Sequence, residues 1–425
     1  MTARLHRLGN GVRIVCDPMP GLETLALSVV IGRGARFETL EQSGWSHLLE
    51  HMVFKGAGNR SARQIVEAIE AEGGQINAAT GYERTSFQVR ALKGGLALAM
   101  EIVSDLIRRP SLSETDLVRE KQVIAQEIAE AADAPDDYVF DLAQTAAFGD
   151  HPLGRPILGT VASIETANPE SLEAFRAGLY DPASIVISAS GAVDEVELLA
   201  LAESWFGDAT PHSAALSMAP SAFLGGVQPK ARRLEQAHLV LMLPAPSARD
   251  EAYFPIRVFA EALGGGMSSR LFQEARERRG LAYGIDAYAD CYQDGGVLGI
   301  YAGCAPGDAA ELAKVAAGEI LALTRKIDDA ELSRAKAQLK ASLFMARESA
   351  LARAEQSAGQ TLLFDHLFTA GEIGASIDAV SAEDVRLAGE GLFSPGLTAS
   401  AVLGGQAAIK ASAQFHKTLI GYSSR

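Results

Sequence analysis

The strongest signal in this chain is Ser46-His47-Leu48-Leu49-Glu50-His51-Met52-Val53-Phe54. Its apolar residues recur at helical spacing, and two histidines four residues apart lie on one face of such a helix. Each imidazole can offer one nitrogen to a single Zn²⁺ ion. Glu50 directly precedes the second histidine, close enough to accept a proton from a water molecule at that ion. Histidines at this spacing also occur on helices where they only pack, so the pattern alone leaves both interpretations open.

This stretch has a counterpart in the second half of the chain. Residues 46–54 match Glu261–Ser269 (EALGGGMSS) at an offset of 215 residues. Leu117–Lys121 matches Leu332–Lys336 at the same offset. A constant offset over such a distance indicates an internal duplication.

The polar residues of the first copy are lost together in the second. At the offset of 215, His47, Glu50, His51, Glu120 and Glu127 correspond to Ala262, Gly265, Gly266, Ala335 and Ser342. Residues needed only for packing have no reason to disappear as a set. We therefore predict one domain with a metal site and one copy without it.

The length and the pattern of the chain predict its architecture. A chain of 425 residues exceeds the usual limit of one hydrophobic core, so two domains are expected. Strand-like and helical patterns alternate loosely, which predicts an α+β fold of two duplicated domains, each a mixed β-sheet covered by helices. We expect a zinc-binding domain at 1–210, a breaker-rich linker at 211–232 and an inactive copy at 233–425. The predicted strands of the first domain are Gly11–Cys16, Thr24–Ile31, Thr85–Ala91 and Ser184–Ser190, and its helices are Gly44–Val53, Ala62–Glu72, Gly94–Arg108, Glu114–Ala131 and Pro169–Gly178.

Composition excludes several classes of partner. The net charge of −15 argues against nonspecific nucleic-acid binding, which needs a basic surface. No stretch reaches the roughly 18 apolar residues of a membrane helix, and the N-terminal residues lack the apolar run of a signal peptide. We therefore expect no membrane partner and a cytoplasmic location. Cys16, Cys291 and Cys304 are too few and too scattered for a disulfide framework and are expected to be buried thiols.

A catalytic zinc site usually has a third protein ligand. The predicted helix over Glu114–Ala131 carries Glu120, Glu127 and Glu130, any of which could supply it. Spacing alone does not choose among the three.

Several further segments resemble the pitrilysin-type zinc metallopeptidases, which carry the HxxEH motif (inverzincins). The resemblance is closest to the branch of the mitochondrial processing peptidase and its bacterial homologues. The segments that carry it span most of the chain in the family's order: His47–Gly56 (HLLEHMVFKG), Gly73–Ala78 (GGQINA), Arg119–Ile128 (REKQVIAQEI), His151–Thr160 (HPLGRPILGT) and Arg276–Tyr283 (RERRGLAY).

This resemblance implies roles for individual residues. The family's third zinc ligand is a glutamate 76 residues after the second histidine, where this chain has Glu127. Glu120 matches an accessory glutamate next to the ligands. Asn77 and Ala78 match a strand edge that lines the substrate. Arg276 and Tyr283, in the copy without the zinc motif, match residues that contact the substrate and the tetrahedral intermediate.

The resemblance also implies a function. It predicts a zinc metalloendopeptidase with one Zn²⁺ per chain, which cleaves peptides or unfolded segments in an enclosed chamber and acts as a homodimer. Glu50 is the expected general base. The alternatives are a non-catalytic core or assembly subunit and a peptide-binding module of the same fold. The intact set of His47, Glu50, His51 and Glu127 argues against both.

Overall fold

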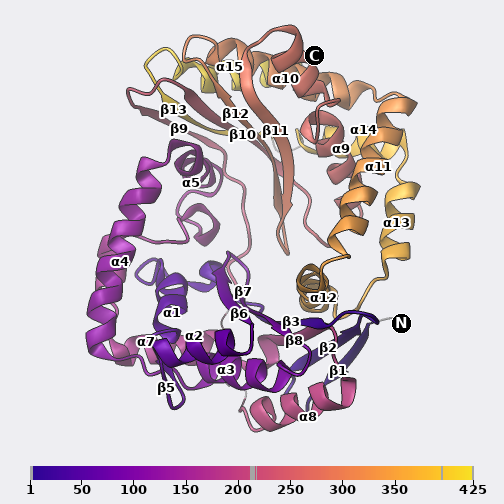
Figure 1. Ribbon diagram of the computed structural model, residues 1–425. Coiled ribbons are helices and arrows are strands. Elements are labelled where there is room, and N and C mark those ends of the chain that lie inside the picture. The colour runs from indigo at the N-terminus through magenta and orange to yellow at the C-terminus, as the bar shows by residue number, and fades with distance from the viewer. Residues whose placement is uncertain (1–2, 211–215, 217, 394–395, 424–425) are drawn as a thin grey trace. The chain divides into compact units, whose positions relative to one another are not determined.

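The structure is a computed structural model that describes residues 3–210, 216, 218–393 and 396–423. It divides into two compact units, each built from a sheet and helices (Figure 1). Unit 1 comprises Met1–Ala129, Pro156–Ala219 and Phe344–Thr369, and unit 2 comprises Glu130–Arg155, Pro220–Leu343 and Ala370–Arg425. The units thus do not follow the order of the sequence, because each takes one helical segment from the other half. The domain limits predicted at residues 210 and 233 are limits of the sequence repeat and not of these compact units, and they stay a prediction.

Unit 1 contains a mixed six-stranded sheet in the order β1-β2-β8-β3-β7-β6. Only β2 and β8 run parallel. Because successive residues of a strand face opposite sides, Val29 joins the main core with α1 and α3, whereas Val30 packs with Ala358 of α12 on the other face. The strands are β1 (Arg4–Arg7), β2 (Arg13–Pro18), β3 (Thr24–Ile31), β6 (Gln75–Thr80), β7 (Thr85–Leu92) and β8 (Ile185–Gly191), with a separate small ribbon of β4 (Gly56–Ala57) and β5 (Arg60–Ser61).

The helices of unit 1 confirm the helical segments predicted for the first half to within two residues at each end. They are α1 (Trp45–Val53), α2 (Ala62–Ala71), α3 (Leu96–Arg108), α4 (Glu114–Asp133), α6 (Val161–Glu165), α7 (Pro169–Leu179), α8 (Glu195–Phe206) and α12 (Ala350–Phe364), with short turns η1 (Ala35–Phe37) and η3 (Pro182–Ser184). α12 comes from the second half of the chain and is held by a buried ion pair in which Arg353 donates to both oxygens of Asp17 on β2, at 2.7 and 2.5 Å.

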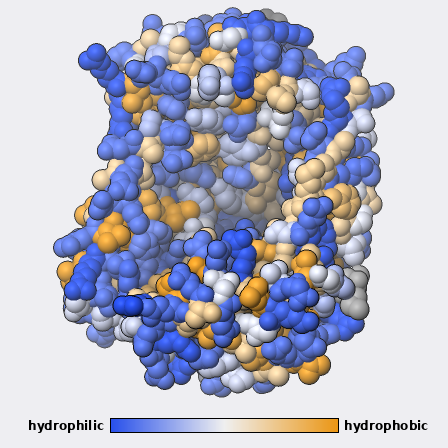
Figure 2. Space-filling view, in the orientation of Figure 1, coloured by the Kyte–Doolittle hydropathy of each residue, from blue (hydrophilic) through white to orange (hydrophobic). Residues whose placement is uncertain are grey.

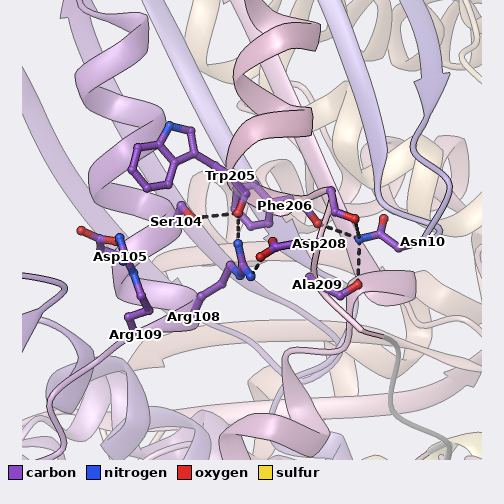
Figure 3. Close-up of polar contacts among 10 residues, drawn as sticks. Asn10, Ser104, Asp105, Arg108, Arg109, Trp205, Phe206, Asp208 and Ala209 are labelled. Atoms are coloured by element: carbon purple, nitrogen blue, oxygen red, sulfur yellow. Dashed lines mark hydrogen bonds and ion pairs between the residues drawn. The ribbon is translucent and has the colours of Figure 1, made fainter.

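The C-terminal end of α8 is held by side chains from other elements (Figure 3). The carbonyl of Trp205 accepts hydrogen bonds from Ser104 Oγ at 3.3 Å and from the guanidinium of Arg108, both on α3. Asn10 Nδ2 donates to the carbonyls of Phe206 at 2.6 Å and Ala209 at 2.9 Å. These contacts satisfy carbonyls that a helix end leaves without an intrahelical partner. They fasten the end of α8 to α3 and to the turn between β1 and β2.

Unit 2 contains a mixed five-stranded sheet in the order β11-β12-β10-β13-β9, in which only β13 and β9 run parallel. One face packs on the helical core around Phe259 and Phe415, and on the other Phe140 of α5 stacks on Tyr301, with ring centroids 5.4 Å apart. The strands are β9 (Gly226–Ala231), β10 (Ala237–Ala245), β11 (Ala282–Cys291), β12 (Gly296–Cys304) and β13 (Ala399–Gly404). The helices are α5 (Pro135–Phe148), α9 (Tyr253–Gly264), α10 (Ala309–Arg325), α11 (Asp329–Ala346), α13 (Ala370–Ala379), α14 (Ala382–Gly391) and α15 (Lys410–Ser423), with the 3-10 turn η2 (Pro152–Gly154) and the π-helix η4 (Phe272–Arg278).

The linker predicted at 211–232 is partly wrong. Residues 211–215 and 217 lie outside the described residues, but Gly226–Ala231 forms the edge strand β9. β9 runs parallel to β13 as β2 runs parallel to β8, so β9 is the second copy's counterpart of β2. Its Pro229 is tolerated because an edge strand has one side free of ladder hydrogen bonds.

The repeat itself is visible in the structure, with one correction to its register. α11 begins 215 residues after α4, so Ala335 and Ser342 occupy the places of Glu120 and Glu127. α9, the counterpart of α1, ends at Gly264. Gly265 and Gly266 therefore lie beyond that helix and do not replace Glu50 and His51 one for one.

Three general properties of the chain follow from the described residues. No helix among them is both long and apolar enough to span a bilayer. The face shown in Figure 2 is mostly hydrophilic, with apolar residues in small groups. All three cysteines are free thiols, and burial raises the pKa of Cys16 to about 11, so that this thiol stays protonated and unreactive.

Candidate metal centre

The start of α1 is fixed by a glycine and a buried carboxylate. Gly44 adopts a left-handed conformation with φ 89°, and an added Cβ would lie 2.6 Å from the carbonyl oxygen of Leu158. The Glu38 side chain accepts hydrogen bonds from the backbone N–H groups of Gly44 at 2.9 Å and Ser46 at 2.7 Å. A carboxylate here satisfies free amides and complements the helix dipole. The first turn of α1, which carries His47, is therefore held in place.

The apolar stripe of α1 determines where its polar face points. Leu48, Leu49, Met52 and Val53 are fully buried in the core of unit 1. Residues at these positions share one side of a helix. His47, Glu50 and His51 consequently lie along the other side, where they stay partly accessible.

α4 presents its glutamates to this face by the same principle. Leu117 and Ile124 are buried in the core of unit 1, and Glu120 is buried between them on the same side of the helix. Glu127 lies two turns beyond Glu120, so it shares that side. Packing of α4 on the core therefore carries both carboxylates to α1.

The three predicted ligands come together. The rings of His47 and His51 have centroids 4.6 Å apart. Glu127 Oε2 lies 3.9 Å from His47 Nε2 and 3.6 Å from His51 Nε2. One ligand atom from each residue lies within 4.8 Å of the others, and in the described part of the chain this is the one such group of three or more His, Cys, Asp or Glu residues. Glu130 does not belong to it.

The surroundings of the histidines suit a cation. Burial, and then the neighbouring His51, lower the pKa of His47 to about 4, so this ring is neutral at pH 7. His51 Nδ1 lies 3.1 Å from Glu120 Oε2, a contact that favours a proton on Nδ1, while Nε2 faces Glu127. Glu120 Oε1 also pairs with Lys55 Nζ at 2.8 Å. Glu120 thus lies behind a ligand, as predicted for an accessory glutamate.

Glu50 lies next to the metal group but outside it. Its Oε2 accepts a hydrogen bond from the hydroxyl of Thr80 on β6. Burial raises the pKa of Glu50 above its usual value. A carboxylate with a raised pKa is a stronger base, as proton abstraction from water requires.

Asn77 and Ala78 lie on β6, at the end of the sheet of unit 1. β6 pairs with β7 on one side, in the register Asn77↔Gln88 and Ala78↔Phe87. On its other side no strand from the described part of the chain is paired with it, so its backbone can pair with an added extended segment. Their role in substrate binding stays a prediction.

Arg276 and Tyr283 lie together in unit 2. Arg276 is on the π-helix η4, and its guanidinium carbon is 4.7 Å from the ring centroid of Phe272 and 5.9 Å from that of Tyr283. Tyr283 is 80% exposed on β11, the edge strand of the second sheet, and so is available to a ligand. Their contact with substrate stays a prediction. Phe272 is an additional member of this cluster.

Sequence reasoning missed three residues that support the metal centre. Lys55 follows His51 by four residues, a spacing that could have drawn attention to it. Thr80 follows Ala78 by two residues and therefore shares its side of β6. Glu38 lies in a loop and gave no comparable signal.

Comparison with known proteins yields two family matches. Residues 13–161 match the sequence model described as Insulinase (Peptidase family M16), and residues 166–339 match the one described as Peptidase M16 inactive domain. An uncharacterised zinc protease of Bacillus subtilis, YmxG, is 36% identical over 385 residues, which cover 90% of this chain and 94% of that protein. An uncharacterised zinc protease of Streptomyces coelicolor is 36% identical over 394 residues, which cover 91% of this chain and 86% of that protein.

Two solved structures share the fold. A protease from Helicobacter pylori superposes with a TM-score of 0.88 at 20% identity and covers 95% of this chain and 99% of its own. A protein from Pseudomonas fluorescens described as a peptidase M16 inactive domain superposes with a TM-score of 0.86 at 18% identity, covering 96% of this chain and 98% of its own. At these identities the likeness concerns the fold alone.

Proposed function

This chain belongs to peptidase family M16, and from that membership we propose that it is a zinc-dependent endopeptidase that hydrolyses peptides or unfolded polypeptide segments. The single observation that carries the proposal is the convergence of His47 Nε2, His51 Nε2 and a Glu127 carboxylate oxygen, with Glu50 beside them. The second copy of the repeat has no such group among its described residues.

The donor set fits zinc. Two neutral imidazoles and one carboxylate are a ligand combination found in catalytic zinc sites, which keep a further position for water or substrate. His47, His51 and Glu127 would hold one ion per chain. Bound zinc supplies a Lewis acid that makes water more acidic and polarises a peptide carbonyl.

The remaining chemistry comes from this chain's own residues. A Glu50 oxygen accepts the proton of the attacking water and then delivers it to the nitrogen of the leaving amine. The Thr80 hydroxyl holds this carboxylate by a hydrogen bond while the proton moves. Glu120 keeps the proton of His51 on Nδ1, away from the ligand nitrogen. Each of these residues acts at a stated atom and none has to leave its place.

The proposal also assigns the residues predicted to bind substrate. The free side of β6 at Asn77 and Ala78 pairs with an extended peptide through backbone hydrogen bonds, which explains a preference for unfolded segments. Arg276 and Tyr283 bind the substrate as donors to a carbonyl oxygen that gains negative charge. Processing-type specificity and a homodimer belong to the same proposal. Sedimentation of the purified chain tests the dimer.

The decisive experiment measures zinc content and peptide cleavage together. The purified chain is expected to bind one zinc per chain and to cleave a mixed library of internally quenched peptides, with cleavage abolished by a chelator. Glu50→Gln should retain zinc and lose about 10²- to 10⁴-fold in kcat, because general base catalysis contributes that much. Glu70→Gln, an exposed glutamate on α2, is the matched control and should change neither quantity.

Two outcomes would contradict the proposal. Full cleavage by Glu50→Gln would remove Glu50 as the base. A zinc-loaded wild-type chain that cleaves no peptide would favour a peptide-binding module or an assembly subunit instead.

A further inference from the structure

Thr80 makes a direct contact to the proposed general base. Its hydroxyl donates a hydrogen bond to Glu50 Oε2. A donor at one carboxylate oxygen restricts the orientation of the carboxylate, whereas a carboxylate without a donor is free to rotate.

The direction of the Thr80 side chain follows from the alternation of β6. Ile76 and Ala78 pack against the core of unit 1, and Thr80 lies two residues further along on the same side. β6 keeps an unbroken antiparallel register with β7 from Gln75 to Thr80, which ends on the pair Thr80↔Thr85. The hydroxyl is thus carried by a regular strand and not by a loop.

Glu50 needs such support. A glutamate side chain has several rotatable bonds, and ordering it costs conformational entropy. Catalytic groups must be held close to one productive geometry by neighbours whose own conformation is fixed. α1 supplies the backbone position of Glu50, but the Thr80 hydroxyl supplies the hydrogen bond to its carboxylate.

From these contacts we propose that Thr80 is a positioning residue that fixes the carboxylate of Glu50, so that the strand with the free edge also sets the place of the base. This inference rests on the proposed function, because Glu50 is a base only in that reaction. The same strand then aligns the peptide through its backbone and the base through Thr80. Any shift of β6 moves both together, which preserves their relative placement.

Thr80→Val tests the inference, since valine keeps the shape and the backbone N–H and removes only the hydroxyl. We expect kcat to fall about 10-fold or more, at the lower end of the effect of losing an outer partner of a reacting group. KM should change less than about 2-fold and zinc content should not change, because neither substrate pairing nor the ligands are altered. Thr80→Ser restores the hydroxyl and should recover kcat to within about 3-fold of the wild type.

Thr85→Val is the matched control. Thr85 faces Thr80 across the two strands and is buried, but its hydroxyl donates to the carbonyl of Arg33 at 3.2 Å. It should leave kcat unchanged even if it lowers stability. Equal losses of kcat in both valine variants, or a rise in KM alone in Thr80→Val, would overturn the inference in favour of a structural role.

Crystal structures of the zinc-loaded wild type and Thr80→Val provide a readout that does not depend on turnover. The carboxylate of Glu50 is expected to move or to adopt several conformations in the variant. An unchanged Glu50 side chain would overturn the role of Thr80. A wild-type chain that cleaves no peptide would instead refute the proposed function, and the two failures are thereby distinguished.

Discussion

Replacement of Glu120 by glutamine tests how this chain fixes the tautomer of a zinc ligand. Glu120 uses one oxygen for His51 Nδ1 at 3.1 Å and the other for Lys55 Nζ at 2.8 Å, and its side chain is only 7% exposed. A glutamine has one oxygen and one NH₂ group. The Lys55 ammonium can only donate hydrogen bonds, so the amide oxygen of the glutamine faces Lys55. The NH₂ group then faces His51 Nδ1. That nitrogen must then accept, and the proton moves to Nε2, the atom that would bind zinc.

The size of the effect follows from these contacts. A hydrogen bond to a charged group contributes about 1.5–3 kcal/mol, and each 1.4 kcal/mol is a factor of ten in affinity. Glu120→Gln should therefore weaken zinc binding about 10- to 100-fold, the range known for outer partners of metal ligands. The fold should remain, because Leu117 and Ile124 still anchor α4.

Competition for zinc with a chromogenic chelator measures this change. The double variant Lys55→Met/Glu120→Gln removes the ammonium, lets the amide oxygen return to His51, and should regain part of the lost affinity. Lys121→Met is the control, because Lys121 donates to the carbonyl of Glu165 at 2.9 Å and lies outside the metal group. Wild-type affinity in Glu120→Gln, or no recovery in the double variant, would refute the tautomer argument.

Three further predictions concern stability and substrate. Burial, and then Asp137, raise the pKa of Asp141 from 3.8 to about 6. The folded state therefore binds more protons than the unfolded state, and the protein loses stability as pH rises from about 4 to 6. In urea unfolding, Asp141→Asn should raise the free energy of unfolding by up to about 3 kcal/mol at pH 7 and leave it unchanged at pH 3. Arg353→Met leaves the buried Asp17 carboxylate without its partner and should cost about 3–5 kcal/mol, in contrast to a smaller loss when Asp17→Asn is added. Phe272→Leu removes the ring beneath the Arg276 guanidinium and should raise KM about 2- to 5-fold at constant zinc content; an unchanged KM would show that the stacking is irrelevant to substrate.

The parts of this fold that could be predicted from sequence are those with a strong local pattern. α1 and α4 were predictable because their buried residues recur at helical spacing, and β3 and β7 because their sequences show strand-like alternation. The complete set of metal ligands could not be predicted from the sequence pattern alone. Spacing did not separate Glu127 from Glu120 and Glu130, and the choice depended on the family resemblance.

The parts that could not be predicted depend on tertiary contacts. β9 carries glycine and proline, which in isolation are typical of a linker, and only its pairing with β13 makes it a strand. The alignment of Gly265 and Gly266 with Glu50 and His51 was wrong, because a run of three glycines carries no sequence pattern that could determine the register. No local pattern could place α12 against the first sheet or α5 against the second, since these contacts join distant segments.

The metal centre combines the two kinds of information. The apolar stripe of α1 decides which face is buried, and a helix rotates by about 100° per residue. A change of register by one residue at Leu48 or Met52 would carry both imidazoles away from Glu127. The core of unit 1 therefore sets the ligand geometry, while Glu120 contacts His51 Nδ1 and Thr80 contacts Glu50 Oε2.

The second copy keeps the scaffold without the ligands because the scaffold's stability comes from the buried stripe and not from the polar face. Loss of a metal site in one copy of a repeat then costs little stability, which explains how one half of the chain can become inactive and still fold.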